Sequence, residues 1–145
     1  MTDPGAQIMT LEIRLSGWRG NSRKWYRAVE FPEAASLYDL HCAIQDVVGF
    51  DDDHMYEFYT GKRWDKRESE LGESATPVDP GTYDEIQLTE VFPTGKGLKL
   101  YYWFDFGDDW MFEITRRPET TIANKKMKYP RVVEKHGRNP PQYGA

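Results

Sequence analysis

The chain is poor in cysteine and has no long apolar run. Cys42 is the only cysteine among 145 residues, so an intrachain disulfide and a cysteine-based zinc site are excluded. No apolar stretch approaches the roughly 20 residues of a membrane-spanning helix. The first residues, MTDPGAQ, also lack the basic and then apolar segments of a secretory signal. We therefore expect a cytoplasmic protein without a membrane partner, in line with its low cysteine content.

Charge is distributed unevenly along this chain, whose net charge is −5. Residues 1–115 contain 11 basic against 22 acidic residues, whereas residues 116–145 contain 8 against 2. A basic end of this kind is typical of an arm that binds nucleic acid, or of a segment docked on its own acidic domain. Apolar side chains at Tyr129, Val132 and Val133 favour docking. The candidate nucleic-acid contacts are Lys125, Lys126, Lys128, Arg131, Lys135 and Arg138.

Several segments carry the hydrophobic patterns of regular secondary structure. Residues 7–15 alternate between apolar and polar, and residues 25–31 follow after a short loop, which predicts an antiparallel pair of strands. Ser36 and Asp39 have the spacing of a capping box and Gly49 is a helix stop, so a helix is expected between them. We further expect a hairpin of residues 55–59 and 62–64, a surface loop at 65–85, a helical turn at 88–92, a polar linker at 118–128 and a strand at 129–134.

The order of these segments predicts an α+β fold in a single domain spanning residues 1–145. We expect a mixed or mainly antiparallel sheet with one long amphipathic helix on one face, β-grasp-like in outline. Residues 1–6 are expected to be disordered, and the basic segment 116–145 is expected to dock on the domain. The helix is predicted to be amphipathic because its apolar stripe contains Leu37, Leu40, His41, Ile44, Val47 and Val48.

The densest aromatic run, residues 98–114, predicts a β-hairpin with its turn at residues 106–109. Alternation places Tyr101, Trp103 and Asp105 on one face of the first strand. Asp108 and Asp109 join Asp105 at the turn, so this acidic rim is a solvated turn, a cation site or an acid/base pair, and turn statistics favour the solvated turn. The core face of the hairpin is predicted to hold Leu98, Leu100, Tyr102, Phe104, Trp110, Phe112 and Ile114.

Five short motifs together resemble the plasmid pRi open-reading-frame-three-like family. They are DLHCAIQ at residues 39–45, GFDDDHMYEF at 49–58, DFGDDW at 105–110, YPR at 129–131 and GRNPP at 137–141. The resemblance runs from about Leu11 to Pro141. Members of this family are labelled mobile-element passenger or resolvase-like proteins, and their biochemical role is undefined. The resemblance therefore implies an association with plasmids or transposable elements, without implying a reaction.

Asp51, Asp53 and His54 form the second acidic segment, for which a metal site is one interpretation. The register of a calcium-binding loop fails, because its fifth and twelfth positions would be methionine and lysine. Members of the family that this chain resembles often carry further histidines where it has Tyr56 and Phe112. If those imidazoles bind a transition metal in the family, this chain lacks two of the ligands. We therefore predict no metal and no cofactor, and interpret His54 as a turn or strand-cap residue. His41, on the helix stripe, is predicted to be a core or boundary residue.

The catalytic interpretations are weak. A serine recombinase needs a serine among arginines that bind phosphate, and no serine here has that setting. We predict no catalytic residue and a non-enzymatic binding or accessory protein with a protein or peptide partner. The alternatives are a nucleic-acid accessory protein acting through its basic tail and a hydrolase-like enzyme using the acidic rim. The candidate binding residues are Tyr101, Trp103, Asp105, Asp108 and Asp109, together with Asp51, Asp53 and His54.

Overall fold

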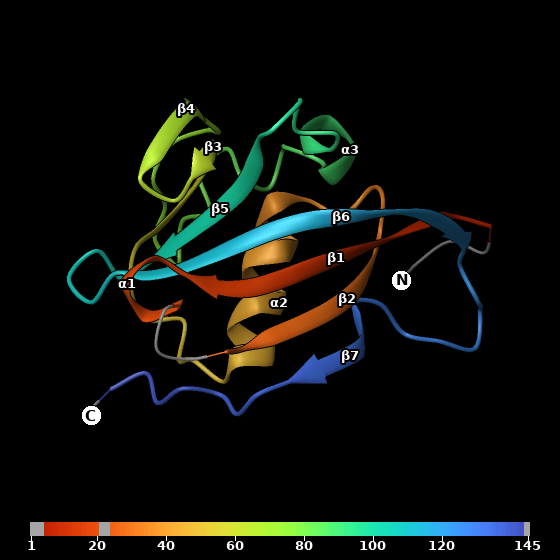
Figure 1. Ribbon diagram of the computed structural model, residues 1–145. Helices are drawn as coiled ribbons and strands as arrows, with labels where there is room; N and C mark the ends of the chain where they lie inside the picture. Colours follow the sequence, from red (N-terminus) through yellow and green to blue (C-terminus); the bar gives the residue numbers. More distant parts are fainter. Residues whose placement is uncertain (1–4, 21–23, 144–145) are drawn as a thin grey trace.

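The computed structural model describes residues 5–20 and 24–143, and its strands form one seven-stranded sheet (Figure 1). The elements are β1 (Gln7–Ser16), α1 (Gly17–Gly20), β2 (Tyr26–Pro32), α2 (Leu37–Val48), β3 (Tyr56–Arg63), β4 (Lys66–Glu70), α3 (Leu88–Val91), β5 (Lys99–Phe104), β6 (Trp110–Ile122) and β7 (Arg131–His136). The strand order is β4-β3-β5-β6-β1-β2-β7. Every neighbouring pair is antiparallel, and α2 lies across one face of the sheet (Figure 1).

Helix α2 begins and ends where the sequence predicted. The Ser36 hydroxyl accepts a hydrogen bond from the Asp39 amide at 3.1 Å, and the Asp39 carboxylate accepts one from the Ser36 amide at 2.9 Å. Gly49 ends the helix with a φ of 76°, a conformation that glycine adopts at low cost. These caps satisfy backbone groups that the helix itself leaves unpaired.

The predicted fold class was nevertheless wrong. The structure is mostly an antiparallel sheet with three short helices, and α2 contains only 12 residues. No parallel pair occurs among the described strands, so the mixed sheet and the β-grasp-like outline with one long helix are not formed. The error arose because polar stretches of the sequence fold as strands. The expected disorder of residues 1–6 falls mainly on residues 1–4, which lie outside the described residues.

Two expected loops are partly strands. Residues 55–64 were expected to form their own hairpin, but β3 runs unbroken from Tyr56 to Arg63 and pairs with β4 inside the predicted surface loop. Strand β6 continues to Ile122, through part of the predicted linker 118–128. All five residues of β4 are exposed. A charged edge strand with no buried face lacks the period-2 signal by which strands are recognised.

The hairpin of β5 and β6 agrees with its predicted pattern. Pairing of Leu100 with Ile114 and of Tyr102 with Phe112 aligns the core residues across the two strands. All of these side chains are buried, and Trp110 is 2% exposed, as predicted. Tyr101 and Met111 face the other side of the sheet, where they form a second small cluster with Tyr59. The hairpin therefore supplies the main core with one face and a smaller aromatic layer with the other.

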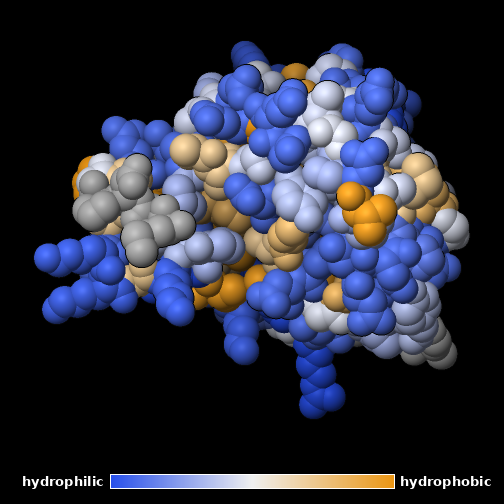
Figure 2. Space-filling model, turned by 180° about the vertical axis from the view of Figure 1, so that it is seen from behind, coloured by the Kyte–Doolittle hydropathy of each residue, from blue (hydrophilic) through white to orange (hydrophobic). Residues whose placement is uncertain are grey.

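The C-terminal segment contacts the sheet through β7, which pairs with β2 at its edge. Beyond β7, the Asn139 side chain accepts hydrogen bonds from the Trp25 indole and the Arg27 guanidinium, both at 2.8 Å. Seen from behind the view of Figure 1, the surface is mainly hydrophilic, with only scattered apolar side chains (Figure 2). Within the described residues, no helix has the length and apolar character needed to cross a membrane.

Candidate functional site

The three aspartates of the hairpin turn do not act as one cluster. Asp105 and Asp109 both have left-handed backbones, with φ values of 61° and 55°. The Asp105 carboxylate accepts hydrogen bonds from the amides of Gly107 and Asp108, both at 3.2 Å, so it builds the turn itself. The Asp108 side chain is exposed, and its backbone carbonyl accepts a hydrogen bond from Arg19 at 3.0 Å. Only Asp109 points toward the aromatic layer, where its carboxylate meets Trp103.

Asp105 instead meets the other acidic segment. Its carboxylate lies 3.4 Å from His54 Nε2, and the Asp53 carboxylate lies 3.5 Å from the same nitrogen. Tyr143, from the C-terminal segment, is 2.8 Å from His54 Nε2 and donates a hydrogen bond to Asp53. This hydrogen bond is the main reason why the pKa of Asp53 is lowered. The acidic segments thus converge at His54, but Asp108 and Asp109 take no part.

Asp51 is held in the same loop through its backbone amide, which donates to the Gln142 side chain at 2.7 Å. Gln142 also donates to the Asp53 carboxylate at 2.8 Å. Across residues 5–20 and 24–143, no group of three or more histidine, cysteine, aspartate and glutamate side chains has a metal-binding arrangement. The loop is therefore organised by hydrogen bonds to the C-terminal segment.

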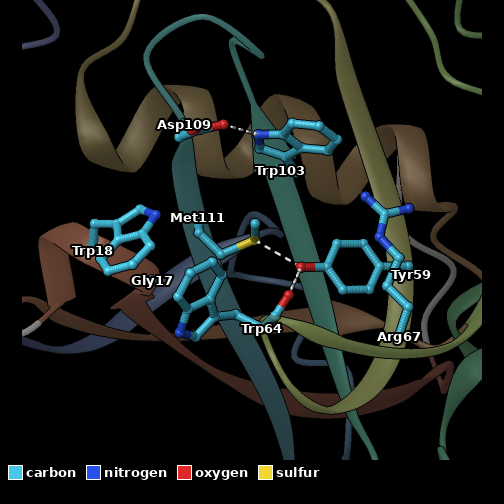
Figure 3. A pocket seen from close by; sticks show the side chains of 8 residues that line it. All are labelled: Gly17, Trp18, Tyr59, Trp64, Arg67, Trp103, Asp109 and Met111. Atoms are coloured by element: carbon cyan, nitrogen blue, oxygen red, sulfur yellow. Dashed lines mark hydrogen bonds between the residues drawn. The ribbon is translucent and has the colours of Figure 1, made fainter.

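A pocket opens on the sheet face opposite α2 (Figure 3). Trp103 and Trp64 are half-buried at its walls, while Trp18 is 71% exposed and lies 5.2 Å from Trp64, ring centre to ring centre, in an edge-to-face arrangement. The volume of the pocket is about 170 Å³. We call it the aromatic pocket, and its lining residues are Gly17, Trp18, Tyr59, Trp64, Arg67, Trp103, Asp109 and Met111.

The floor of the aromatic pocket is fixed by buried side chains. Tyr59 is fully buried, and its hydroxyl donates to the Trp64 carbonyl and lies 3.2 Å from the Met111 sulfur. Burial raises the pKa of Tyr59 to about 12, so this hydroxyl stays protonated at neutral pH. Tyr101 is 1% exposed and stacks on Tyr59, its strand partner, with ring centres 5.5 Å apart. Tyr101, a predicted binding residue, therefore packs against a lining residue without lining the pocket itself.

Gly17 allows α1 to bring Trp18 to the pocket. Its φ is 67°, and a Cβ atom at this position would lie 3.1 Å from the Met111 Cβ. A larger residue would be strained in this left-handed conformation and would crowd the strand beneath. Arg19, two residues on, lies over the Trp110 ring at 3.8 Å. These contacts hold the short helix α1 against the start of β6.

Two charged groups border the pocket. The Arg67 guanidinium lies over the rings of Tyr59 and Trp103, at 4.0 and 5.3 Å from their centres. Its charge is compensated by an ion pair with Glu57 and a longer contact to Glu70 at 3.5 Å. At the opposite rim, Asp109 Oδ1 accepts a hydrogen bond from the Trp103 indole at 2.9 Å. The aromatic pocket is therefore bordered by a compensated cation and by a carboxylate whose described partner is neutral.

A buried polar network lies on the other face, under α2. His41 is fully buried and stacks on Tyr56, with ring centres 3.7 Å apart. Its Nε2 lies 2.7 Å from the Asp52 carboxylate, and its Nδ1 contacts the Tyr102 hydroxyl. Gln45 donates to the same hydroxyl at 3.0 Å. Every contact is satisfied by a neutral imidazole that donates from Nε2 and accepts at Nδ1. Burial lowers the pKa of His41, although Asp52 opposes this shift.

The basic tail makes several contacts to acidic side chains of the sheet. Arg131 is 3.2 Å from Glu30 on β2. Arg117 on β6 bridges Glu12 at 2.9 Å and Glu134 on β7 at 2.7 Å. Strand β7 itself is mostly exposed. The positive charge around β7 is therefore partly compensated within the chain.

The comparisons with known proteins identify the family. The sequence matches the plasmid pRiA4b ORF-3-like proteins over residues 7–143. This chain belongs to that family. The resemblance inferred from the short motifs is confirmed. A crystal structure of a protein of unknown function from Methanosarcina mazei Go1 shares the fold, with a TM-score of 0.74 and 22% identity over 95% of this chain and 74% of that chain. Among curated proteins, the comparison gives no match.

Most of the aromatic pocket was missed by sequence reasoning, which singled out only Trp103 and Asp109 among its lining residues. Trp18 lies far in the sequence from Tyr59 and Trp64, and all three lie far from Trp103 on β5, so only the strand order brings these side chains together. One signal was present in the sequence: five tryptophans exceed the need of a core this small. That excess indicates that some tryptophans lie at the surface, but not which ones or where.

Proposed function

We propose that this protein is a non-enzymatic binding protein whose aromatic pocket takes one side chain of a peptide partner. The observation that carries the proposal is the convergence of three tryptophans, Trp18, Trp64 and Trp103, outside the main core. Trp18 is 71% exposed and so contributes little to burial within its own chain. Tryptophan is enriched among the residues that carry most of the energy of protein interfaces. An exposed indole beside two half-buried ones is therefore best explained by a ligand.

The size of the aromatic pocket favours a side chain over a cofactor. Pockets for drug-sized ligands and cofactors enclose roughly 300–1,000 Å³, whereas this pocket encloses about 170 Å³. That space accommodates a single side chain, with the rest of a peptide lying across the surface. Met111 at the floor is suited to such a role, because its thioether is polarizable and adapts to irregular shapes.

The wall of the pocket is rigid enough to select a ligand. Trp103 and Met111 are directly paired across β5 and β6, and Tyr59 lies on the adjoining strand β3. Sites built on strands hold their side chains more firmly than sites built on loops. The family description, plasmid pRiA4b ORF-3-like, supports an accessory role for the protein in association with plasmids.

The test is an array of immobilised twelve-residue peptides of random sequence, probed with the labelled full-length chain. We expect a subset of peptides to bind, and Trp18→Ala to remove most of this binding with little loss of stability, because the side chain is exposed. The matched control is Ile122→Ala, an exposed apolar residue, 62% accessible, at the opposite end of β6. An array without bound peptides, or binding that survives Trp18→Ala unchanged, would refute the proposal.

A further inference from the structure

The charges around the aromatic pocket define the chemistry of its occupant. We infer that the pocket binds the side chain of an arginine, with the guanidinium against the indoles and beside the Asp109 carboxylate. This inference rests on the function proposed above, because it identifies which side chain of the peptide enters the same pocket. It is carried by three observations: the position and contacts of the Asp109 carboxylate, the internal contacts of Arg67 and the shape of the pocket.

Asp109 supplies a negative charge without a cationic partner among the described residues. The Trp103 indole, a neutral donor, donates to Oδ1 at 2.9 Å. Oδ2 accepts no hydrogen bond from the described residues. A carboxylate held at the rim of an apolar pocket favours a cationic ligand, because hydrogen bonds between charged groups are stronger than neutral ones.

Arg67 shows that the walls of this pocket accept a guanidinium. It lies 4.0 Å above the Tyr59 ring, while its charge is met by Glu57. Because Glu57 compensates this cation, Arg67 does not leave the pocket with a net positive charge. A second guanidinium can therefore use the accessible indole surfaces of Trp18 and Trp64 in the same way, with Asp109 as its counter-ion.

The flat shape of guanidinium distinguishes arginine from lysine. A planar, weakly hydrated group stacks on indole rings and loses little hydration on entering, whereas an ammonium is compact and strongly hydrated. Neutral apolar side chains would fill the space but would leave the Asp109 carboxylate beside them without a charged partner. The combination of indole walls and a carboxylate at the rim is thus best matched by arginine.

The test uses two-dimensional ¹H–¹⁵N spectra of the indole groups of the full-length protein, titrated with N-acetyl-arginine amide. Of the five tryptophans, Trp18, Trp64 and Trp103 line the pocket, while Trp25 and Trp110 are buried in the core and serve as internal controls. N-acetyl-citrulline amide has the same shape without the charge. We expect pocket indole signals to shift with arginine, and citrulline to bind about tenfold more weakly.

Asp109→Asn is the deciding variant. Asparagine also tolerates the left-handed backbone of residue 109 and can still accept the Trp103 hydrogen bond, so the substitution removes only the charge. We expect it to abolish the preference for arginine over citrulline. Equal binding of the two compounds by the wild type, shifts confined to Trp25 and Trp110, or the absence of any shift would overturn the inference. The peptide array is scored independently, so peptide binding without an arginine preference would leave the proposed function standing.

Discussion

Two tyrosines that contact His41 provide a direct test of the buried network. Tyr102 and Tyr56 are both fully buried, and both contact the His41 imidazole. The Tyr102 hydroxyl bonds His41 and Gln45, whereas the Tyr56 hydroxyl has no hydrogen-bond partner among the described residues. Replacing either tyrosine by phenylalanine removes one hydroxyl group and leaves the ring in place. Only the Tyr102 substitution should nevertheless lower the free energy of unfolding.

The expected magnitudes follow from the partners that each hydroxyl leaves behind. Tyr102→Phe strands the Nδ1 acceptor of His41 and the amide donor of Gln45. Each buried group without a partner costs about 1–3 kcal/mol, so the loss should be about 2–6 kcal/mol. Tyr56→Phe strands nothing and removes a buried hydroxyl whose desolvation is uncompensated. The substitution should be neutral or should stabilise the protein by at most about 3 kcal/mol.

The assay is urea unfolding of the full chain followed by far-ultraviolet circular dichroism. Stability changes are taken from the transition midpoint, provided that the slope stays constant between variants. His41→Gln in each background reports whether the effect of Tyr102 passes through the imidazole, since coupled residues give non-additive losses. Equal destabilisation by Tyr102→Phe and Tyr56→Phe would refute the hydrogen-bond assignment, because shape and burial are the same in the two cases.

Two further predictions concern protonation and the C-terminal segment. Because the pKa of His41 is lowered by folding, the unfolded chain binds more protons, so stability should be complete above about pH 6.5 and fall below it. Unfolding free energies measured between pH 8 and 5.5 should show this fall in the wild type and not in His41→Gln; a rise in stability toward acid would contradict it. Deleting residues 123–145 should lower the melting temperature, because it removes β7 and leaves the Trp25 indole and Arg27 without Asn139. Full-length protein should bind duplex DNA no more tightly than about 10⁻⁴ M at physiological salt, and micromolar, steeply salt-dependent binding would instead identify the tail as a nucleic-acid arm.

The parts of the fold that were predictable are those in which local chemistry and burial agree. Helix α2 was found because Ser36, Asp39 and Gly49 mark both of its ends, and the β5–β6 hairpin because its core face alternates strictly. Strand β4 and the second half of β6 were missed because almost all of their side chains are exposed. Their pairing is decided by the strands beside them. The fold class failed for this reason, since it was judged from buried faces alone.

The candidate site, like the fold, could be predicted only in part from the sequence. Alternation correctly separated Trp103 from Tyr102, because it depends only on the pleat of the strand. It failed for Asp105, whose left-handed backbone turns the carboxylate toward His54. The contact between His41 and Asp52 was also beyond sequence reasoning, since it depends on how the loop after α2 folds back. Sequence spacing therefore predicted the strand face on which a residue lies, but not which residues of other elements it contacts.

Successive side chains of β5 face opposite sides of the sheet, so residues for stability and residues for binding alternate along this strand. Tyr102 faces α2 and joins the buried network, while the next residue, Trp103, faces the aromatic pocket. The strand partners of these two residues, Phe112 and Met111, divide in the same way across β6. Substitutions on the core face should therefore act on unfolding, and substitutions on the pocket face should act on ligand affinity. Trp18 lies on α1 outside this hairpin and is 71% exposed, so a loss of binding in Trp18→Ala without a loss of stability can be assigned to the pocket itself.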